Sequence, residues 1–412
     1  MPRTLFSEAD PDLDEASGDP HPLMLSTRMR WLGAAMLLGG VACGAHIIPP
    51  LVPAIPSGEV VTSIFLIGDA GGPGGGDDDP VLVELTKQAT AAPRASAIVF
   101  LGDNIYPRGM PKPDAPERPE AEKRIMREIN VAVKSGIKAY FIPGNHDWFR
   151  MGKEGWDAVR RSEIFIRERG NGLALQEPKL GCPGPEVVDV GPWIRLALLD
   201  TQWWLQRADF PKARDSVSTC VQYTEEHVVK RLSQVLADTA AGKRVIVAGH
   251  NPMATKGEHG GYFSIKTHIF PLTALKRYLY IPLPLLGSIY PMARSEGLFG
   301  YSQDLNARAN RHMRQALLGA MTTHPPMLLA AGHDHNMQVM RGPVAKFSVV
   351  SGVGMINHFG GVGWTKNTLF ASHGPGFMRV DVDRRGRARL SVQDYDPPRG
   401  FHERMGLWLT EP

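Results

Sequence analysis

Five short polar motifs in the sequence place a glycine next to a carboxylate, an amide or an imidazole. In chain order they are 68-GDAG-71, 102-GDNIY-106, 144-GNHD-147, 249-GH-250 and 332-GHDH-335. This mixture of oxygen and nitrogen donors suits iron, zinc or manganese better than calcium or a thiolate-bound metal. A glycine beside a ligand lets the chain turn sharply and leaves room for an ion or a substrate near the backbone. The motifs therefore predict a metal site.

The motifs offer more ligands than one metal ion needs. A single histidine such as His250 is more often a packed core residue, but core packing does not explain five such motifs in order. Two ions that share a bridging carboxylate can hold both the attacking and the leaving oxygen of an in-line phosphoryl displacement. The sequence therefore predicts a dinuclear centre.

Each motif follows an apolar run of strand length, and helix-like stretches separate several of these runs. Strands that alternate with helices indicate an α/β sheet with a largely parallel centre, and ligands collect beyond the carboxyl ends of such strands. The predicted helices cover residues 119–136 and 224–242, and the predicted strands cover 60–67, 97–101, 138–142, 193–199, 244–248 and 327–331.

Two later segments have a different pattern. Alternating apolar residues in 337–352 and 376–395 predict antiparallel hairpins of a second sheet. Residues 263–304 interrupt the alternation and are treated as an insertion. Within it, 279-LYIPLPLLGSIYP-291 is apolar but is broken by three prolines, so it is neither a helix nor a membrane span. It either packs on the domain or meets a membrane or a lipid-like substrate.

The N-terminus resembles an export segment. Residues 1–58 comprise a polar, disordered start, an apolar run after Arg28 and Arg30 that ends in small residues near Cys43, and a proline-rich tether. This pattern predicts a lipoprotein signal with Cys43 as the lipid-bearing residue. The alternatives are a plain signal peptide or signal anchor, or a cytoplasmic protein. We expect an exported, membrane-tethered protein of the cell envelope or the extracellular space, with a catalytic domain at 59–396 and a C-terminal tail at 397–412.

Charge and cysteine content add two expectations. The net charge is only +4 over 412 residues and the basic residues are scattered, so no nucleic-acid partner is expected. With Cys43 set aside, Cys182 and Cys220 either pair in an oxidising compartment or remain free thiols.

The motifs resemble those of the calcineurin-like metallophosphoesterases, and specifically the purple acid phosphatase branch. The branch is marked by GDxG, GDxxY, GNH followed by an acid, VxxH and GHxH, and Tyr106 is the residue that general metallophosphoesterases lack. The small, tartrate-resistant acid phosphatases are the most similar. The resemblance covers roughly residues 60–394 without the insertion. It implies a β-sandwich of two mixed sheets flanked by helices, with a dinuclear site at the carboxyl ends of the strands.

The resemblance also implies which residues hold each metal. It implies a phosphatase in which a metal-bound hydroxide attacks the phosphorus of a phosphorylated small molecule, a phosphate monoester. Tyr106 would bind as a phenolate because a trivalent ion favours that form. Ferric iron would be held by Asp69, Asp103, Tyr106 and His335, and ferrous iron, zinc or manganese by Asp103, Asn145, His250 and His333.

Three further residues resemble catalytic positions of the branch. His146 and His259 would contact the phosphate, and His259 would protonate the leaving alkoxide. Glu258 would orient His259 or share its proton. The alternative for Glu258 and His259 is that they are solvated loop residues. Trp148 stands where the small acid phosphatases have a histidine, which puts their leaving-group selectivity in doubt here.

Two rival functions fit the same sequence. The first is a phosphodiesterase or pyrophosphatase that acts on nucleotides or lipid headgroups. The second is a non-catalytic metal-binding envelope protein, although a retired site has no reason to keep every ligand. Asp147 and Asp334 are expected to support the motif loops rather than bind metal.

Overall fold

The structure of the protein is a computed structural model that describes residues 51–73, 76, 78–214, 219–238, 242–274, 278–283, 286–298, 301–356 and 359–410. Cys43 and the export segment lie outside the described residues, as does Leu285 of the insertion. No helix among the described residues is long and apolar enough to cross a membrane.

The first of two seven-stranded sheets carries the N-terminal motifs. Its strand order is β14-β13-β12-β1-β2-β3-β4. Strands β1 to β4 are parallel, and the hairpin strands on the other side of β1 are antiparallel. The strands are β1 (Val60–Ile67), β2 (Ala97–Phe100), β3 (Lys138–Phe141), β4 (Ala174–Gln176), β12 (Gly376–Asp383), β13 (Ala388–Asp396) and β14 (Gly400–Trp408).

The second sheet carries the histidine motifs, in the strand order β11-β9-β10-β8-β7-β6-β5. Its centre is parallel, and β5, β9 and β11 pair antiparallel with their neighbours. The strands are β5 (Glu186–Val190), β6 (Ile194–Leu198), β7 (Arg244–Ala248), β8 (Leu328–Ala331), β9 (Met337–Arg341), β10 (Phe347–Ser351) and β11 (Thr368–Ser372).

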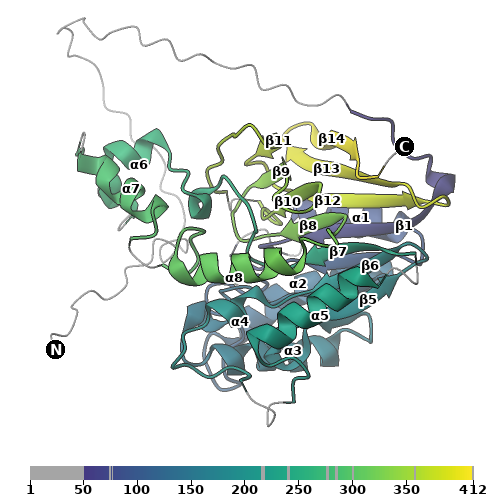
Figure 1. Ribbon diagram of the computed structural model, residues 1–412, viewed down its shortest axis with the longest axis horizontal. Helices are drawn as coiled ribbons and strands as arrows, with labels where there is room; N and C mark the ends of the chain where they lie inside the picture. Colours follow the sequence, from purple (N-terminus) through teal and green to yellow (C-terminus); the bar gives the residue numbers. More distant parts are fainter. Residues whose placement is uncertain are drawn as a thin grey trace, which may run out of the picture.

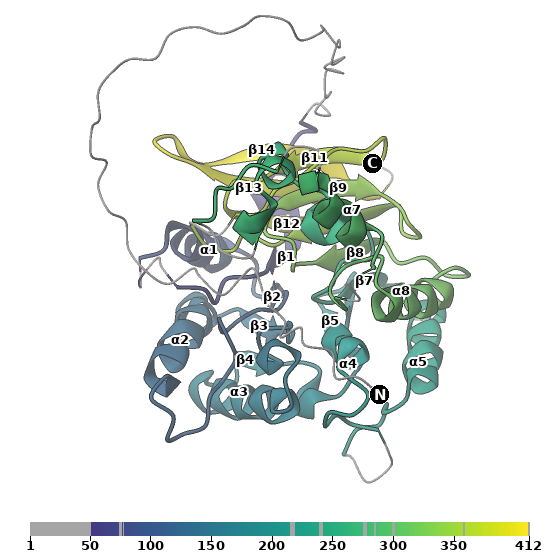
Figure 2. The same cartoon turned by 90° about the vertical axis from the view of Figure 1, so that its left-hand side faces the viewer.

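The sheets pack face to face, with helices on both outer faces (Figures 1 and 2). Residues such as Leu66, Leu101, Leu198 and Ile246 form the apolar core between the sheets. The first sheet is covered by α1 (Pro80–Ala91), α2 (Arg118–Ser135) and α3 (Gly155–Arg169), and the second by α4 (Thr201–Leu205), α5 (Glu225–Ala237) and α8 (Arg308–Ala320). The expected α/β fold of two mixed sheets flanked by helices is confirmed.

The six strands and two helices predicted from the apolar runs are present with end shifts of a few residues. Local chemistry explains the helix ends. The Thr224 side chain accepts a hydrogen bond from the His227 backbone at the start of α5, and Gly136 ends α2 with a left-handed φ of 71°.

The C-terminal hairpins divide between the sheets. Strands β9 and β10 belong to the second sheet, as expected, whereas β12 pairs with β1 and so brings its hairpin to the first sheet. The chain also continues past residue 396 into β14, which pairs with β13. Met405 and Leu407 of β14 reach the central core, but the polar run 402-HER-404 hides this strand in the sequence.

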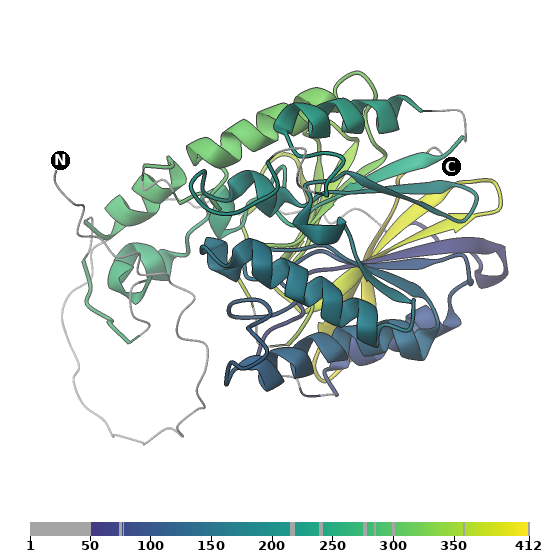
Figure 3. The same cartoon turned by 90° about the horizontal axis from the view of Figure 1, so that it is seen from below.

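The insertion forms short helices that project away from the sheets (Figures 1 and 3). They include α6 (Ile265–Ile269) and α7 (Ile289–Ser295). Contrary to expectation, Pro291 lies inside α7, because it occupies the first turn, where no backbone N–H is required. Several apolar side chains of the insertion are exposed, including Ile265, Leu286, Ile289, Met292 and Leu298.

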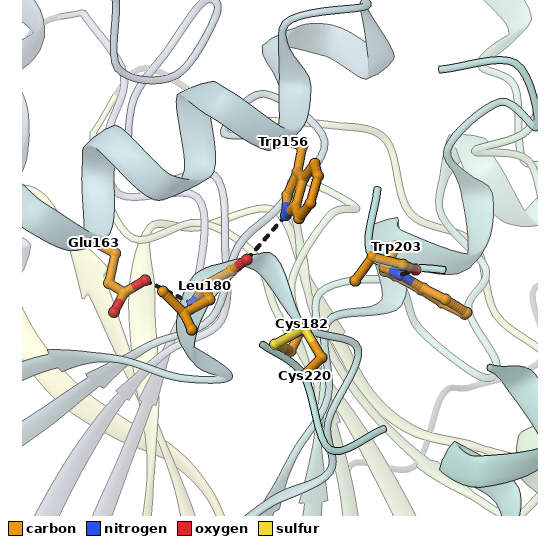
Figure 4. Close-up of a disulfide and its surroundings, with 7 residues drawn as sticks. Trp156, Glu163, Leu180, Cys182, Trp203 and Cys220 are labelled. Carbon is orange, nitrogen blue, oxygen red and sulfur yellow. Dashed lines mark hydrogen bonds between the residues drawn. A yellow bond between two sulfur atoms is a disulfide. The ribbon is translucent and has the colours of Figure 1, made fainter. Parts of the chain in front are cut away.

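Cys182 and Cys220 form a disulfide, which decides between the two alternatives left open by the sequence (Figure 4). The adjoining turn is held to α3, because Leu180 accepts a hydrogen bond from the Trp156 indole and donates its backbone N–H to Glu163. The disulfide joins the loop that precedes β5 to the segment that precedes α5.

Candidate metal centre

The five motifs occupy the loops that leave the carboxyl ends of β1, β2, β3, β7 and β8. Asp69 follows β1 by two residues, and His250 and His333 follow β7 and β8 by two residues each. These strands belong to both sheets, so the site lies where the two sheets meet. All seven predicted ligands are brought to this place, and six of them are buried, whereas the side chain of His335 is 19% exposed.

Glycines in the motifs make room for the ligand side chains themselves. A Cβ atom on Gly102 would lie 2.4 Å from Nδ1 of His250. A Cβ atom on Gly144 would lie 2.2 Å from Oδ1 of Asp103. Neither approach is tolerable for any other residue, so the glycines permit ligands from neighbouring loops to converge.

Three candidate ligands adopt a left-handed backbone that side-chain-bearing residues rarely use. The φ angles are 59° at Asp69, 55° at Asp103 and 72° at His333. Such conformations cost on the order of 1–3 kcal/mol each and cluster at functional sites. The loops therefore hold these side chains at the expense of local backbone energy.

The Tyr106 hydroxyl is the centre of one group of ligands. It lies 3.0 Å from Oδ1 of Asp69, 3.1 Å from Oδ2 of Asp103 and 3.1 Å from Nε2 of His335. His335 Nε2 is also 3.4 Å from Oδ1 of Asp69. These are the four residues expected to hold ferric iron.

Nε2 of His250 is the centre of the other group. It lies 3.0 Å from Oδ1 of Asn145, 3.1 Å from Nδ1 of His333 and 3.4 Å from Oδ2 of Asp103. Nδ1 of His250 is 2.8 Å from the carbonyl oxygen of Leu101, to which it can donate, so Nε2 is the nitrogen that faces the other candidate ligands. Oδ2 of Asp103 is common to both groups, as a bridging ligand requires.

The cluster is electrostatically prepared for a cation. Burial alone would lower the pKa of His250, but Asp103 outweighs burial and raises it to about 9. Burial would raise the pKa of Asp103, but His250 and His146 lower it, so this carboxylate is ionised. Burial, together with the neighbouring histidines, holds the pKa of His333 well below its usual range and keeps it neutral. Metal ions bind carboxylate and neutral imidazole, so a bound cation would displace the proton that Asp103 favours on His250.

The donor set fits a metal ion. Ligand atoms of Asp103, His250 and His333 all lie within 4.8 Å of one another, and all three residues are buried. Nε2 of His333 is buried and has no hydrogen-bond partner among the residues that the structure describes. A buried imidazole nitrogen without a partner is costly unless something such as a metal engages it. The ligand assignment stays a prediction, and this geometry agrees with it.

The expected supporting residues lie behind the ligands. Asp147 accepts hydrogen bonds from the backbone N–H groups of Asn104, Ile105 and Gly144, which ties two motif loops together. Trp148 is fully buried and donates its indole N–H to Asp200 at 2.9 Å. Trp148, which stands where the small acid phosphatases have a histidine, is therefore part of the packed core.

The candidate catalytic residues line a pocket that opens to solvent over the candidate ligands. His146 and His259 both line it, together with Tyr301 and Glu258. Nδ1 of His146 is 2.8 Å from the carbonyl oxygen of Pro107, and its Nε2 lies 3.9 Å from Oδ2 of Asp103. The ring of His259 stacks on that of His333, with centroids 4.0 Å apart.

His259 has a carboxylate partner that the sequence did not indicate. Glu258 is exposed at the rim, and Nδ1 of His259 meets Oδ1 of Asp304 at 2.9 Å. The expected role of Glu258 stays a prediction. Asp304 lies 45 residues away, in the insertion, where no motif or periodicity marks it. The same is true of Arg294, which binds Asp304, and of Tyr301. The sequence offered no local signal for these three residues.

A model of the calcineurin-like phosphoesterase family matches residues 62–280. A comparison with curated protein sequences gives no match.

Several solved structures are similar. GAP50, the anchor in the inner membrane complex of Plasmodium, is 14% identical with a TM-score of 0.48, covering 83% of this chain and 88% of its own. A purple acid phosphatase from yellow lupin (Lupinus luteus) seeds is 12% identical with a TM-score of 0.49, covering 86% and 55%. A dimetal phosphatase from Danio rerio is 13% identical with a TM-score of 0.46, covering 85% and 99%.

Proposed function

The chain belongs to the calcineurin-like phosphoesterase family, and from that premise we propose that it is a metal-dependent phosphomonoesterase of the purple acid phosphatase type. The observation that carries the proposal is the position of the Tyr106 hydroxyl, within 3.1 Å of Asp69, Asp103 and His335. A phenol held among these ligands suits a trivalent ion, which favours the phenolate.

Two ions would be held by the two ligand groups described above, ferric iron by the group around Tyr106 and ferrous iron, zinc or manganese by the group around His250. When bound, the metal pair supplies Lewis acidity and a water activated for attack on phosphorus. Asp103 would be shared by both ions.

The chain's own residues bind and orient the substrate. His146 and His259 line the pocket with Asn145 and offer nitrogen donors for the phosphoryl oxygens. His259 can then give a proton to the leaving oxygen. Glu258 at the rim would meet the alcohol portion of the ester rather than the phosphate, because a carboxylate repels a phosphate dianion.

A substrate screen with metal analysis tests the proposal. The metal-loaded protein is assayed with phenyl phosphate, diphenyl phosphate and pyrophosphate, and Asp103→Ala serves as the control for contaminating phosphatases. We expect two metals per chain, including iron, and faster turnover of the monoester than of either rival substrate. Faster diester or pyrophosphate hydrolysis would favour the rival enzymes. Two bound metals without any hydrolysis would favour the metal-binding protein.

We also propose that the protein is exported and lies at a membrane. The Cys182–Cys220 disulfide supports this, because disulfides persist mainly in oxidising compartments. In addition to the N-terminal segment, the exposed apolar side chains of the insertion offer a second contact for a bilayer.

A further inference from the structure

The insertion supplies a buried ion pair to the wall of the pocket. Asp304 and Arg294 are 3% and 7% exposed, although the insertion around them carries many exposed side chains. Nε of Arg294 donates to Oδ2 of Asp304 at 2.9 Å, and its Nη2 donates to Oδ1 at 3.0 Å. This two-point contact fixes the plane of the carboxylate.

The third contact of this carboxylate is His259. Nδ1 of His259 lies 2.9 Å from Oδ1 of Asp304. Because a carboxylate accepts, Nδ1 carries the proton in this contact. Nε2 is then the nitrogen that His259 presents to the pocket it lines.

His259 is also held from two other sides. Its backbone N–H donates to Oδ1 of Asp334, which follows the ligand His333. Its ring lies nearly parallel to that of His333, at an interplanar angle of 22°. Together with the contact between Asp304 and Nδ1, these interactions fix the backbone of His259, the face of its ring and the edge of its ring.

A buried polar network anchors the segment that carries Asp304. Gln303 is 1% exposed, and its side chain exchanges hydrogen bonds with Gln202 of α4 and accepts one from Asn251. The backbone N–H of Leu305 donates to the carbonyl oxygen of His259 at 2.9 Å. The end of the insertion is therefore attached both to the second-sheet layer and to the histidine that it contacts.

The charges of the pair are balanced. Burial would raise the pKa of Asp304, but His259 and Arg294 outweigh it and lower the pKa. Burial would lower the pKa of Arg294, but Asp304 raises it above its usual range. Both groups stay ionised, so the carboxylate is a permanent acceptor for His259.

We propose that Asp304 and Arg294 are positioning residues, which fix His259 with Nε2 toward the leaving-group oxygen of the bound phosphate ester. The insertion then completes the proton-donating side of the pocket. This inference rests on the proposed function and adds the residues on which proton delivery depends.

The oxygen of a water molecule, which gives up one proton to solvent, forms a bond to phosphorus. The bond between phosphorus and the leaving oxygen breaks, and its electron pair stays on that oxygen. The oxygen takes the Nε2 proton of the His259 imidazolium and leaves as an alcohol. The neutral imidazole keeps its Nδ1 proton on Asp304 and regains a proton on Nε2 from water.

The test compares leaving groups in the metal-loaded protein. Asp304→Asn should slow an alkyl phosphate by about 10- to 100-fold and 4-nitrophenyl phosphate by less than about 3-fold, because only the alkyl ester needs a delivered proton. Adding Asp304→Asn to His259→Ala should cause no further loss, because the two residues act through one proton. Metal content should be unchanged.

Two controls keep the result interpretable. Glu296→Gln removes an exposed carboxylate from the same insertion and should change neither substrate. Asp304→Asn combined with Arg294→Gln removes both charges of the buried pair, so neither is left unpaired. This double variant should reproduce the leaving-group effect if the single variant is unstable.

Equal losses on both substrates, or additive losses in the variant that also lacks His259, would overturn the positioning role. A wild type that hydrolyses no phosphate ester would instead overturn the proposed function on which that role rests.

Discussion

The strand-end loops and the insertion both reach the pocket, but they hold their side chains differently. The loops use glycines at close approaches and left-handed backbone at Asp69, Asp103 and His333. The insertion uses a buried ion pair and a side-chain network around Gln303. The loops follow directly from the central strands, whereas the insertion is attached to the domain through Gln303, near the C-terminal end of the insertion.

This difference separates two tasks. Ligands that share one small volume must be fixed by the backbone, because side-chain freedom would let them drift apart. The leaving group varies with the substrate, so the residues that face it belong to a segment that can change without disturbing the central sheets. We expect changes in the loops to abolish metal binding and changes in the insertion to alter selectivity.

The largest expected effect is that of Asp103→Ala. It removes the only carboxylate common to both ligand groups, so both metals should be lost and turnover should fall by more than about 100-fold. Metal analysis and phenyl phosphate hydrolysis measure this. Asp189→Ala, at an exposed ion pair with Arg195, is the matched control and should retain both metals. Normal turnover in Asp103→Ala would refute the ligand assignment.

Tyr106→Phe should have the next largest effect. The oxidised wild type should absorb visible light through charge transfer from phenolate to ferric iron, and the variant should lose this band. Turnover should fall by about 10- to 100-fold. The ring should stay packed on His146, because only the hydroxyl is removed. A colourless, iron-free and fully active wild type would point to a general metallophosphoesterase instead.

Gln303→Leu probes the anchor of the insertion. It leaves Gln202 and Asn251 without their buried partner and should lower the free energy of unfolding by about 1–3 kcal/mol. Urea denaturation measures the loss, and metal content should not change. A loss of metals in this variant would contradict the division of tasks between loops and insertion.

The smallest expected effect concerns the exposed apolar side chains of the insertion. A protein that begins at Gly58 should bind vesicles of phosphatidylcholine and phosphatidylglycerol weakly. Ile289→Ser with Met292→Ser should weaken this binding by about 10-fold, because each change removes apolar contact area. Both residues are more than half exposed, so folding should be retained.

Vesicle flotation compares this variant with Val83→Ser combined with Val221→Ser, which changes exposed valines elsewhere on the surface. If the parent protein does not float with the vesicles, the insertion has no lipid contact of its own.

The sequence predicted best the features that depend on residues close together in the chain. The six strands, and polar residues such as Asp69 and His250 within two positions of a strand end, are visible in short windows. The sequence suggested Glu258 as a partner of His259 but did not indicate Asp304, which contacts His259 from 45 residues away. Strand β14 was hidden because its first half is polar and only pairing with β13 makes it a strand. These features depend on tertiary packing, which no short window contains.

The candidate ligands also have a consequence for biosynthesis. Asp69 and His333 follow strands of different sheets and lie 264 positions apart in the chain. A growing chain cannot present the full ligand set until β8 has been made and both sheets have joined. If the candidate centre binds metal, the ions are therefore acquired after folding rather than guiding its first steps. If the chain crosses a membrane unfolded, the ions available on the far side decide which metal pair the protein carries.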